Sequence, residues 1–308
     1  MGLRPTHLGY AYQDLLTALR LVDLAVGRAR SVTVDVKMFA GDRFDDITCE
    51  WGTGSRERLQ IKHTDHDRAL SAESFIKDSR GLRLDLLFSS IDRDLTSQPA
   101  TSHRLVVRDT EPDEPDLMRV LQPVGGGIDP GPALHGLGSK RFRFDAAALR
   151  AHDPWKSMLA AVSDEALQRA CACLIVDTGV AACSLNIREP GPAEAALLHR
   201  VTEELGAGRP PNRTRTSEDV ALALIEAAKA ARSRTGTVTV EDLLPRLGLE
   251  TDFGAVREGP RGPGHRGGPL RRAHESGHGR GGHRAAGRCR GGHRRSRHRQ
   301  VVVVRAAR

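Results

Sequence analysis

The N-terminal part of the chain shows two hydrophobic periods, one typical of a helix and one typical of strands. Apolar side chains recur at helical spacing over residues 10–26, which predicts an amphipathic helix there. Residues 31–39 instead alternate between apolar and polar side chains, and this alternation predicts the first core strand. The chain is therefore expected to open with a helix that leads into a sheet.

Two further short strands are predicted next, joined by a strong turn signal. Residues 47–51 alternate, with the apolar side chains on one face of the strand. The turn sequence Gly-Thr-Gly-Ser occupies residues 52–55, and residues 58–62 form the second alternating run. Together the two runs predict a β-hairpin.

Polar side chains gather at one end of this hairpin. Asp46 lies on the face opposite the apolar residues of the first strand, whereas Asp45 is aimed the other way. Gln60 and Lys62 are two residues apart on the second strand, so they share one side. A register that sets Asp46 beside Gln60 would bring a carboxylate, an amide and an ammonium group together.

The rest of the pattern predicts alternating helices and strands. Helices are expected over residues 71–91, 146–151, 155–172 with a break at Ser163, 193–205, 217–231 and 240–247. Strands are expected over residues 103–107, 174–176 and 184–187. Residues 111–138 are rich in Pro and Gly and predict a long loop, and residues 206–215 predict a linker. We therefore expect an α/β fold, a mixed sheet flanked by helices.

Charge divides the chain near Phe253. The whole chain carries a formal charge of +8, and residues 254–308 contribute +13 of it through 15 Arg, no Lys and 2 Glu, which leaves −5 for residues 1–253. The basic balance is therefore no sign that the folded part binds DNA. We expect three parts: a first domain over residues 1–155, a mostly helical extension over residues 156–253, and a tail over residues 254–308.

The tail is too polar to build a core of its own. It holds 13 Gly and 6 His among its arginines, and such a composition predicts disorder because little apolar surface can be buried. Three interpretations are open: an arm that binds nucleic acid, a plain disordered extension, or an out-of-frame translation of a GC-rich gene. The last is favoured by the Arg-only basic content and the abrupt change in composition. It would imply that a downstream domain has been lost.

Membrane and secretory signals are absent from the sequence. It contains no apolar run of 18 residues, and its first residues lack an apolar signal core. The 5 Cys are odd in number and irregularly spaced, so we expect reduced, buried thiols in a cytoplasmic protein. No G-x-x-x-x-G-K-[ST] segment is present, and no nucleotide binding is expected of this chain.

The polar end of the hairpin suits a divalent metal. Mg²⁺ prefers oxygen ligands, usually one or two carboxylates with water and substrate phosphate. Asp46 would supply the carboxylate, Gln60 a side-chain carbonyl and Ile61 a backbone carbonyl, with Mn²⁺ as a substitute metal. Lys62 would activate water and stabilise negative charge on a phosphate. These residues predict a metal-dependent nuclease site.

Three ordered motifs resemble a known nuclease family. They are Gly-Tyr-Ala-Tyr-Gln at residues 9–13, Asp-Asp-Ile at 45–47 and Gln-Ile-Lys-His at 60–63. Together they resemble the PD-(D/E)xK nucleases, which have the restriction-endonuclease-like fold, in their Q-x-K variant. More narrowly, they resemble the double-stranded-DNA endonuclease domain of bacterial anti-phage effectors of the CBASS and STAND-NTPase kinds. The resemblance covers roughly residues 7–66, and Gln60 stands where many members have an acid.

The resemblance implies both a fold and an activity. It implies a restriction-endonuclease-like sheet and Mg²⁺-dependent hydrolysis of double-stranded DNA as part of phage defence. It places Gln13 on the first helix beside the metal site, and it implies a homo-oligomer controlled by downstream domains. A catalytically inactive module for DNA binding or oligomerisation is the alternative, as is a truncated remnant of a STAND NTPase.

Basic residues near the hairpin supply candidate DNA contacts. Lys37, Arg58 and His63 lie close in sequence to the predicted site, and basic side chains bind phosphate without reading base sequence. Only 4% of the residues are aromatic, so a platform for stacking single-stranded bases is not expected. The sequence therefore favours a partner with a phosphate backbone, namely double-stranded DNA.

Overall fold

The computed structural model describes residues 4–63, 68–124, 140–180 and 182–249. The chain divides into two units, Met1–Pro260 and Arg261–Arg308, and every described residue belongs to the first. The expected tail, residues 254–308, lies outside the described residues, as does the second half of the expected loop over residues 111–138. The first half is not all loop, because it contains a short helix (Pro115–Met118) and a short strand (Leu121–Pro123).

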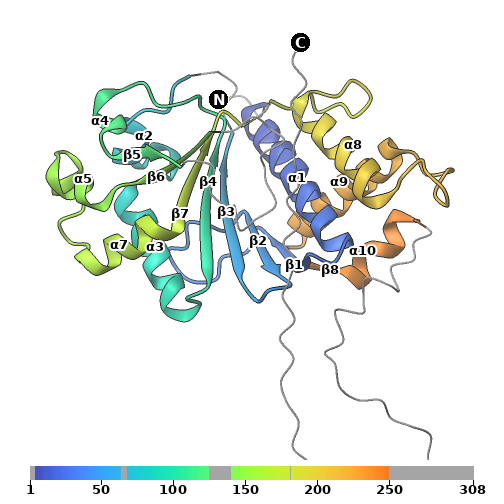
Figure 1. Ribbon diagram of the computed structural model, residues 1–308, viewed down its shortest axis with the longest axis horizontal. Helices are drawn as coiled ribbons and strands as arrows, with labels where there is room; N and C mark the ends of the chain where they lie inside the picture. The colour runs from blue at the N-terminus through green and yellow to red at the C-terminus, as the bar shows by residue number, and fades with distance from the viewer. Residues whose placement is uncertain (1–3, 64–67, 125–139, 181, 250–308) are drawn as a thin grey trace, which may run out of the picture. The chain divides into compact units, whose positions relative to one another are not determined.

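Within the described residues, eight strands form one mixed sheet in the order β5-β6-β7-β4-β3-β2-β1-β8 (Figure 1). The strands are β1 (Ala29–Val34), β2 (Ile47–Trp51), β3 (Arg56–Lys62), β4 (Thr101–Val107), β5 (Leu121–Pro123), β6 (Lys140–Phe144), β7 (Leu174–Thr178) and β8 (Thr237–Thr239). Strands β3, β4 and β7 run parallel, and the remaining pairs are antiparallel. The predicted α/β class, a mixed sheet flanked by helices, is confirmed.

Helices cover both faces of the sheet (Figure 1). One face shares an apolar core with α1 (Arg4–Ala25), α8 (Pro192–Leu205), α9 (Ser217–Ser233) and α10 (Val240–Leu247). The other face packs against α2 (Glu73–Ile76), α3 (Leu84–Ser97), α5 (Ala146–Ala151), α6 (Trp155–Met158) and α7 (Asp164–Cys173). A short α4 (Pro115–Met118) precedes β5, and a 3-10 turn, η1 (Asp78–Arg80), follows α2. The central strands are therefore covered on both sides.

Helix α1 is buried on all sides, which differs from the amphipathic helix expected over residues 10–26. Every residue from Tyr12 to Ala25 is buried, because the sheet covers one side of the helix while α8 and α9 cover others. A helix enclosed in this way has no solvent face to keep polar. Its polar residues therefore make buried contacts, and Gln13 is one of them.

Three predicted elements differ from the structure, each for a local reason. The helix expected over residues 71–91 is split, because Gly81 adopts φ +69° and separates η1 from α3. The strand expected over residues 31–39 ends at Val34, because Asp35 adopts φ +58°. Residues 184–187 form no strand. Left-handed backbone interrupts both helices and strands, and a hydrophobic pattern alone does not reveal it.

The expected boundary between residues 155 and 156 does not divide the fold. Strand β7 lies inside the sheet between β4 and β6, and β8 pairs with β1 at the opposite edge. Helices α8 and α9 pack directly on α1. Residues 156–249 therefore complete the sheet and one of its two cores, so they are part of the domain rather than an extension of it.

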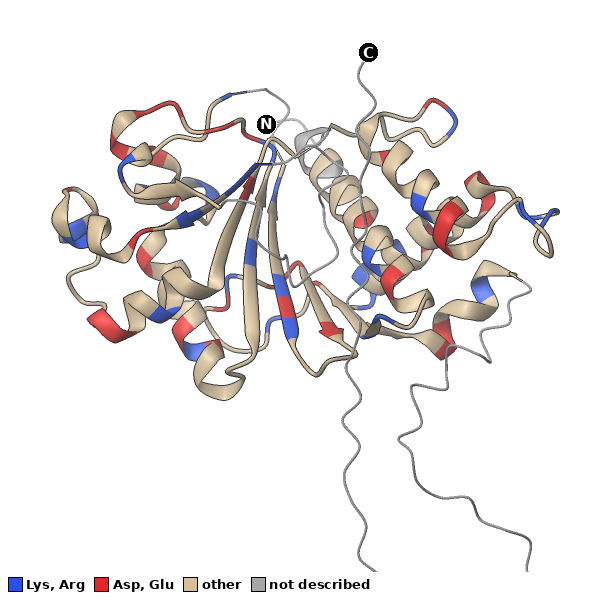
Figure 2. Cartoon of the chain, in the orientation of Figure 1, with Lys and Arg blue, Asp and Glu red and all other residues tan. Residues whose placement is uncertain are grey.

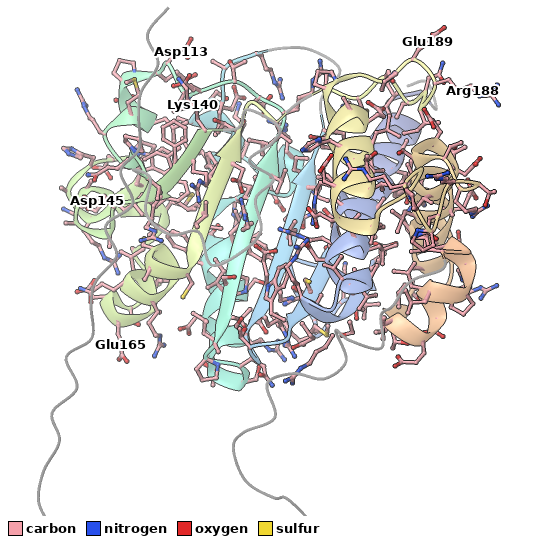
Figure 3. The ribbon with its side chains drawn as sticks, turned by 45° about the vertical axis from the view of Figure 1, so that its right-hand side comes forward. Asp113, Lys140, Asp145, Glu165, Arg188 and Glu189 are labelled. Atoms are coloured by element: carbon pink, nitrogen blue, oxygen red, sulfur yellow. The ribbon has the colours of Figure 1, made fainter. Side chains whose placement is uncertain are left out.

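Two networks of buried ion pairs cross the middle of the sheet, where Figure 2 shows charged residues within the strands. On the α3 side, the guanidinium of Arg58 contacts Asp42 at 2.5 Å and Asp94 at 3.1 Å. On the α1 side, Arg104 contacts Asp177 at 2.8 Å and Glu57 at 3.3 Å. In contrast, exposed charges such as Glu165, Arg188 and Glu189 lie at the periphery (Figure 3). The buried networks tie the inner strands to the surrounding helices and loops.

Candidate active site

The strand register brings the polar end of the hairpin together. Strands β2 and β3 pair with Ile47 opposite Leu59, so the residue before β2 and the residue after Leu59 are neighbours. These residues are Asp46 and Gln60. The carboxyl ends of the parallel strands β3, β4 and β7 lie at this same end of the sheet. Asp46 therefore lies beside the carboxyl end of β3.

Asp46 is held by two strands and a helix. Its Oδ2 accepts hydrogen bonds from Gln60 Nε2 at 2.5 Å and from the backbone N–H of Ile61 at 2.6 Å. The side-chain Nε2 of Gln13 donates to the backbone carbonyl of Asp46 at 3.1 Å. The structure thus brings together Gln13, Asp46 and Gln60, as expected from the sequence. Gln13 acts on the backbone of Asp46 and not on its carboxylate.

Burial raises the pKa of the Asp46 carboxyl to about 6, from an ordinary value of 3.8. The positive charge of Lys62 and the Ile61 N–H lower this pKa, while the carboxylates of Asp45 and Asp35 raise it. The positive charge of Lys62 therefore offsets only part of the effect of burial and of the two acidic neighbours.

Asp45 and Asp46 face different partners, which bears on the choice between them. Asp45 Oδ2 lies 3.9 Å from Nζ of Lys37, whereas Asp46 reaches Gln60 on the neighbouring strand. Lys37 has an exposed side chain, so its contact with Asp45 is a surface ion pair. The geometry favours Asp46 as the carboxylate that works with Gln60.

Lys62 ends β3 and is partly buried. Its charge acts on Asp46, yet among the described residues it forms no ion pair within 4.0 Å. A Cβ placed on Gly81 would lie 3.9 Å from its Nζ, so the ammonium group lies against the turn that follows η1. Lys62 is therefore positioned beside the carboxylate and retains its capacity to bind an anion.

In the structure Gln60 turns the nitrogen of its amide toward Asp46, so a ligand role for both residues requires the amide to be reversed. The expected ligands were Asp46, Gln60 and the Ile61 carbonyl, and the first two lie in contact. Reversal of the Gln60 amide would aim Oε1 instead of Nε2 at the site. Among the residues that the structure describes, no group of three or more His, Cys, Asp or Glu could hold a metal. One carboxylate with amide oxygens and water suits Mg²⁺ better than it suits a metal that needs a full protein cage.

Arg58 does not suit the DNA contact expected of it. Its side chain is fully buried and is enclosed by Asp42 and Asp94. The sequence placed it correctly on β3, but alternation along a strand gives the face and not the depth. A guanidinium inside the core cannot reach a phosphate at the surface, so we assign Arg58 to the framework of the sheet.

His63 and Lys37 remain near the site edge, and one neighbour of His63 was not identified from the sequence. The His63 ring packs against Tyr12 with the ring centroids 4.8 Å apart. Tyr12 is fully buried, and burial strongly raises the pKa of its hydroxyl. Its position next to Gln13 was the only signal available. Tyr12 holds the residue that follows Lys62 against α1.

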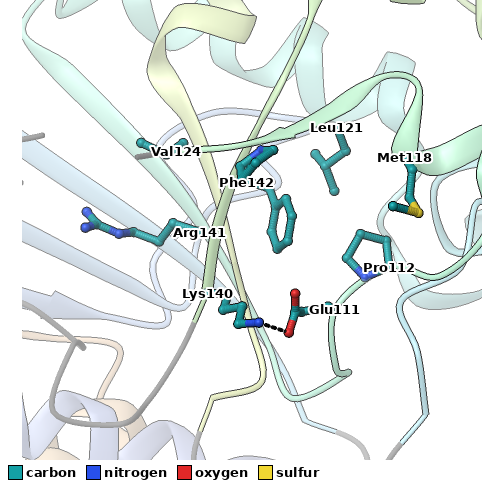
Figure 4. A pocket seen from close by; sticks show the side chains of 9 residues that line it. Glu111, Pro112, Met118, Leu121, Val124, Lys140, Arg141 and Phe142 are labelled. Atoms are coloured by element: carbon teal, nitrogen blue, oxygen red, sulfur yellow. Dashed lines mark ion pairs between the residues drawn. The ribbon is translucent and has the colours of Figure 1, made fainter. Parts of the chain in front are cut away.

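A cavity of about 530 Å³ opens elsewhere on the molecule (Figure 4). Met118, Leu121 and Phe142 line it, and an ion pair between Lys140 and Glu111 closes one side. Neither Asp46, Gln60 nor Lys62 contributes to its wall. The residues of the candidate active site therefore lie outside this cavity.

Comparisons with known proteins returned no relative. No protein-family model matches the chain, and no curated protein matches it significantly. Within the described residues, no helix has the length and apolar character needed to cross a bilayer. The four described cysteines are free thiols, of which Cys49 and Cys171 are buried.

Proposed function

We propose that this protein is a metal-dependent endonuclease that hydrolyses phosphodiester bonds in double-stranded DNA. The observation that carries the proposal is the contact between Asp46 and Gln60 on paired strands, with Lys62 two residues beyond Gln60 on the same side of β3. A buried carboxylate of raised pKa with an ammonium group near it is a combination suited to a metal and a phosphate. It is also a costly arrangement for a purely structural hairpin.

Each residue has a distinct role in the proposed reaction. Asp46 and Gln60 would hold Mg²⁺ or Mn²⁺, with the Ile61 carbonyl as a further ligand. Gln13 fixes the backbone of Asp46 and so the position of its carboxylate. Lys62 would orient the attacking water and stabilise the charge that develops on the phosphate. The bound metal would supply Lewis acidity toward the phosphate oxygen.

The biological setting follows from the motif resemblance. Effectors of anti-phage defence carry nucleases of this kind, so we propose a role in the degradation of invading DNA. A homo-oligomer and regulation by further domains are part of the same proposal.

The alternative is a nuclease-like module that binds DNA without cutting it. The single carboxylate in the donor set favours this alternative, since many metal nucleases use two acids. Plasmid nicking separates the two functions. With Mg²⁺ present, the full chain should convert supercoiled plasmid to open-circular and linear forms, and EDTA or the substitution Asp46→Asn should abolish the conversion. Metal-independent binding without any cleavage would support the inactive module.

A further inference from the structure

At the turn after η1, the backbone of a glycine lies close to two cationic side chains. Gly81 adopts φ +69° and ends η1 through a hydrogen bond from its N–H to the carbonyl of Asp78 at 3.3 Å. A Cβ at Gly81 would lie 3.6 Å from Nη1 of Arg43 and 3.9 Å from Nζ of Lys62. Because glycine has no Cβ, the tips of both side chains can lie close to its backbone.

Two like charges in one place raise each other's energy unless an anion joins them. Lys62 has no ion pair within 4.0 Å among the described residues. Arg43 has one, with Asp78 Oδ1 at 3.4 Å, but the Asp78 side chain is 42% exposed. An exposed ion pair of this length contributes little. Two cationic groups therefore flank Gly81, and among the described residues only Arg43 has an ion-pair partner within 4.0 Å, the partly exposed Asp78.

The backbone that carries Arg43 is held in place by hydrogen bonds to neighbouring side chains. Its N–H donates to Ser90 Oγ at 3.1 Å, and the N–H of the next residue, Phe44, donates to Asp42 Oδ1 at 3.0 Å. Asp42 is in turn paired with the buried Arg58. The segment that carries Arg43 is thus fixed to the core. Such preorganisation reduces the entropy lost when a ligand binds.

We propose that Arg43, Lys62 and the backbone of Gly81 form a binding site for one phosphate of the DNA backbone. The inference rests on the proposed function, and it adds Arg43 as a substrate-binding residue that the motif does not contain. The guanidinium would bind a non-bridging oxygen of the phosphate, and Lys62 would contact the same group from the side of Asp46. The site would bind a phosphodiester group through its charge, without regard to base sequence.

A purely structural role for Arg43 makes a different prediction. In that case Arg43 only tethers η1 through Asp78, and removal of either partner should have the same effect. Asp78→Asn removes the carboxylate charge but keeps Arg43. If the phosphate-binding site exists, this substitution releases Arg43 from its ion pair and leaves the affinity for DNA unchanged or higher. Arg43→Ala should weaken binding, so the two variants separate the two roles.

The test is binding of a blunt 20-base-pair duplex in EDTA, measured by fluorescence anisotropy at several salt concentrations. Residues 1–260, which contain all eight described strands and both cores, are measured beside the full chain, so that any contribution of the Arg-rich tail to binding is determined separately. Arg169→Ala on α7 removes the same charge from an exposed site and serves as the matched control. Circular dichroism and melting check the fold of each variant.

We expect Arg43→Ala to weaken binding about tenfold and to lower the slope of log affinity against log salt by about one. Asp78→Asn should bind at least as tightly as the wild type, and Arg169→Ala should stay within about twofold of the wild-type affinity. Wild-type affinity in Arg43→Ala would overturn the inference, as would equal losses in Arg43→Ala and Asp78→Asn or an absence of wild-type binding.

Cleavage in Mg²⁺ by the same proteins separates this inference from the proposed function. If the wild type cleaves DNA and Arg43→Ala keeps the wild-type affinity, the inferred phosphate-binding site is wrong and the proposed nuclease stands. If binding by the wild type depends on Arg43 but the wild type does not cleave DNA, the proposed nuclease activity is wrong and the phosphate-binding site stands.

Discussion

Asp46 is the residue whose electrostatics most clearly distinguish the site from an ordinary hairpin. Its neighbour Gln60 could be predicted from the turn and the alternation of β2 and β3, and the structure places the two in contact. The raised pKa could not be predicted, because it depends on burial by α1, which is distant in sequence. Arg58 shows the same limit. Its partners Asp42 and Asp94 lie 16 and 36 residues away, and only the fold brings them together.

The raised pKa of Asp46 predicts a pH-dependent cost to stability. A carboxyl whose pKa is about 6 in the folded state and 3.8 ordinarily favours folding when protonated. This contribution is complete below pH 3.8 and is lost as the pH rises through 6. Asp46→Asn removes the cost of the buried charge. It should therefore stabilise the protein at about pH 8 by roughly 1–3 kcal/mol, and by little at about pH 4.

Urea denaturation of both proteins at about pH 4, 6 and 8 checks this expectation, with Asp45→Asn as the control next to it in sequence. A gain that grows toward low pH, or no gain at any pH, would show that the Asp46 carboxylate is well solvated. The case for a site short of positive charge would then be lost.

At the scale of elements, β3 is the strand on which the fold depends. It lies between β2 and β4, and its residues from Glu57 to Ile61 are all buried because helices cover both faces. The hairpin, the parallel strands and most helices could be predicted from periodicity and capping residues. Strands β5, β6 and β8 were not predicted. Strands β5 and β8 have three residues each and show no period, and the break at Gly81 was missed because one glycine in a helical pattern is ambiguous.

The buried network on β3 predicts an asymmetric response to substitution. Arg58→Ala leaves Asp42 and Asp94 inside the core without their partner, and it should destabilise the protein by about 3–5 kcal/mol. Arg58→Met fills a similar volume but also leaves both acids unpaired, so it should rescue little. The triple change Arg58→Met, Asp42→Asn, Asp94→Asn should recover much of the loss.

Chemical denaturation measures these differences, and Arg56→Ala, which removes a partly exposed arginine on the same strand, is the matched control. If Arg58→Ala costs no more than Arg56→Ala, water reaches the network and the assignment of Arg58 to the framework fails.

At the scale of the whole molecule, residues 1–155 should not fold alone. They lack β7, which fills the gap between β4 and β6, and they lack the helices that cover α1. The exposed face of α1 would include Leu16, Leu19 and Val22, all of them buried in the complete unit. The hydrophobic pattern did not reveal this dependence, because it gives the elements and not which strands pair with one another.

Truncation series test the unit directly. Residues 1–260 should melt cooperatively and near the temperature of the full chain, whereas residues 1–155 should be aggregated or should give no cooperative transition in calorimetry. A cooperative transition of residues 1–155 would restore the two-part organisation that the sequence suggested.

The measurement that tests the central claim most directly is the single-turnover rate of duplex DNA cleavage in Mg²⁺ by the wild type, Lys62→Ala and Lys156→Ala. Lys156 is an exposed lysine on α6 and controls for the loss of one positive charge. We predict a loss of about 10²–10⁴-fold for Lys62→Ala and wild-type rates for Lys156→Ala. Equal rates in all three proteins, cleavage that persists in EDTA, or no cleavage by the folded wild type would contradict the proposed nuclease.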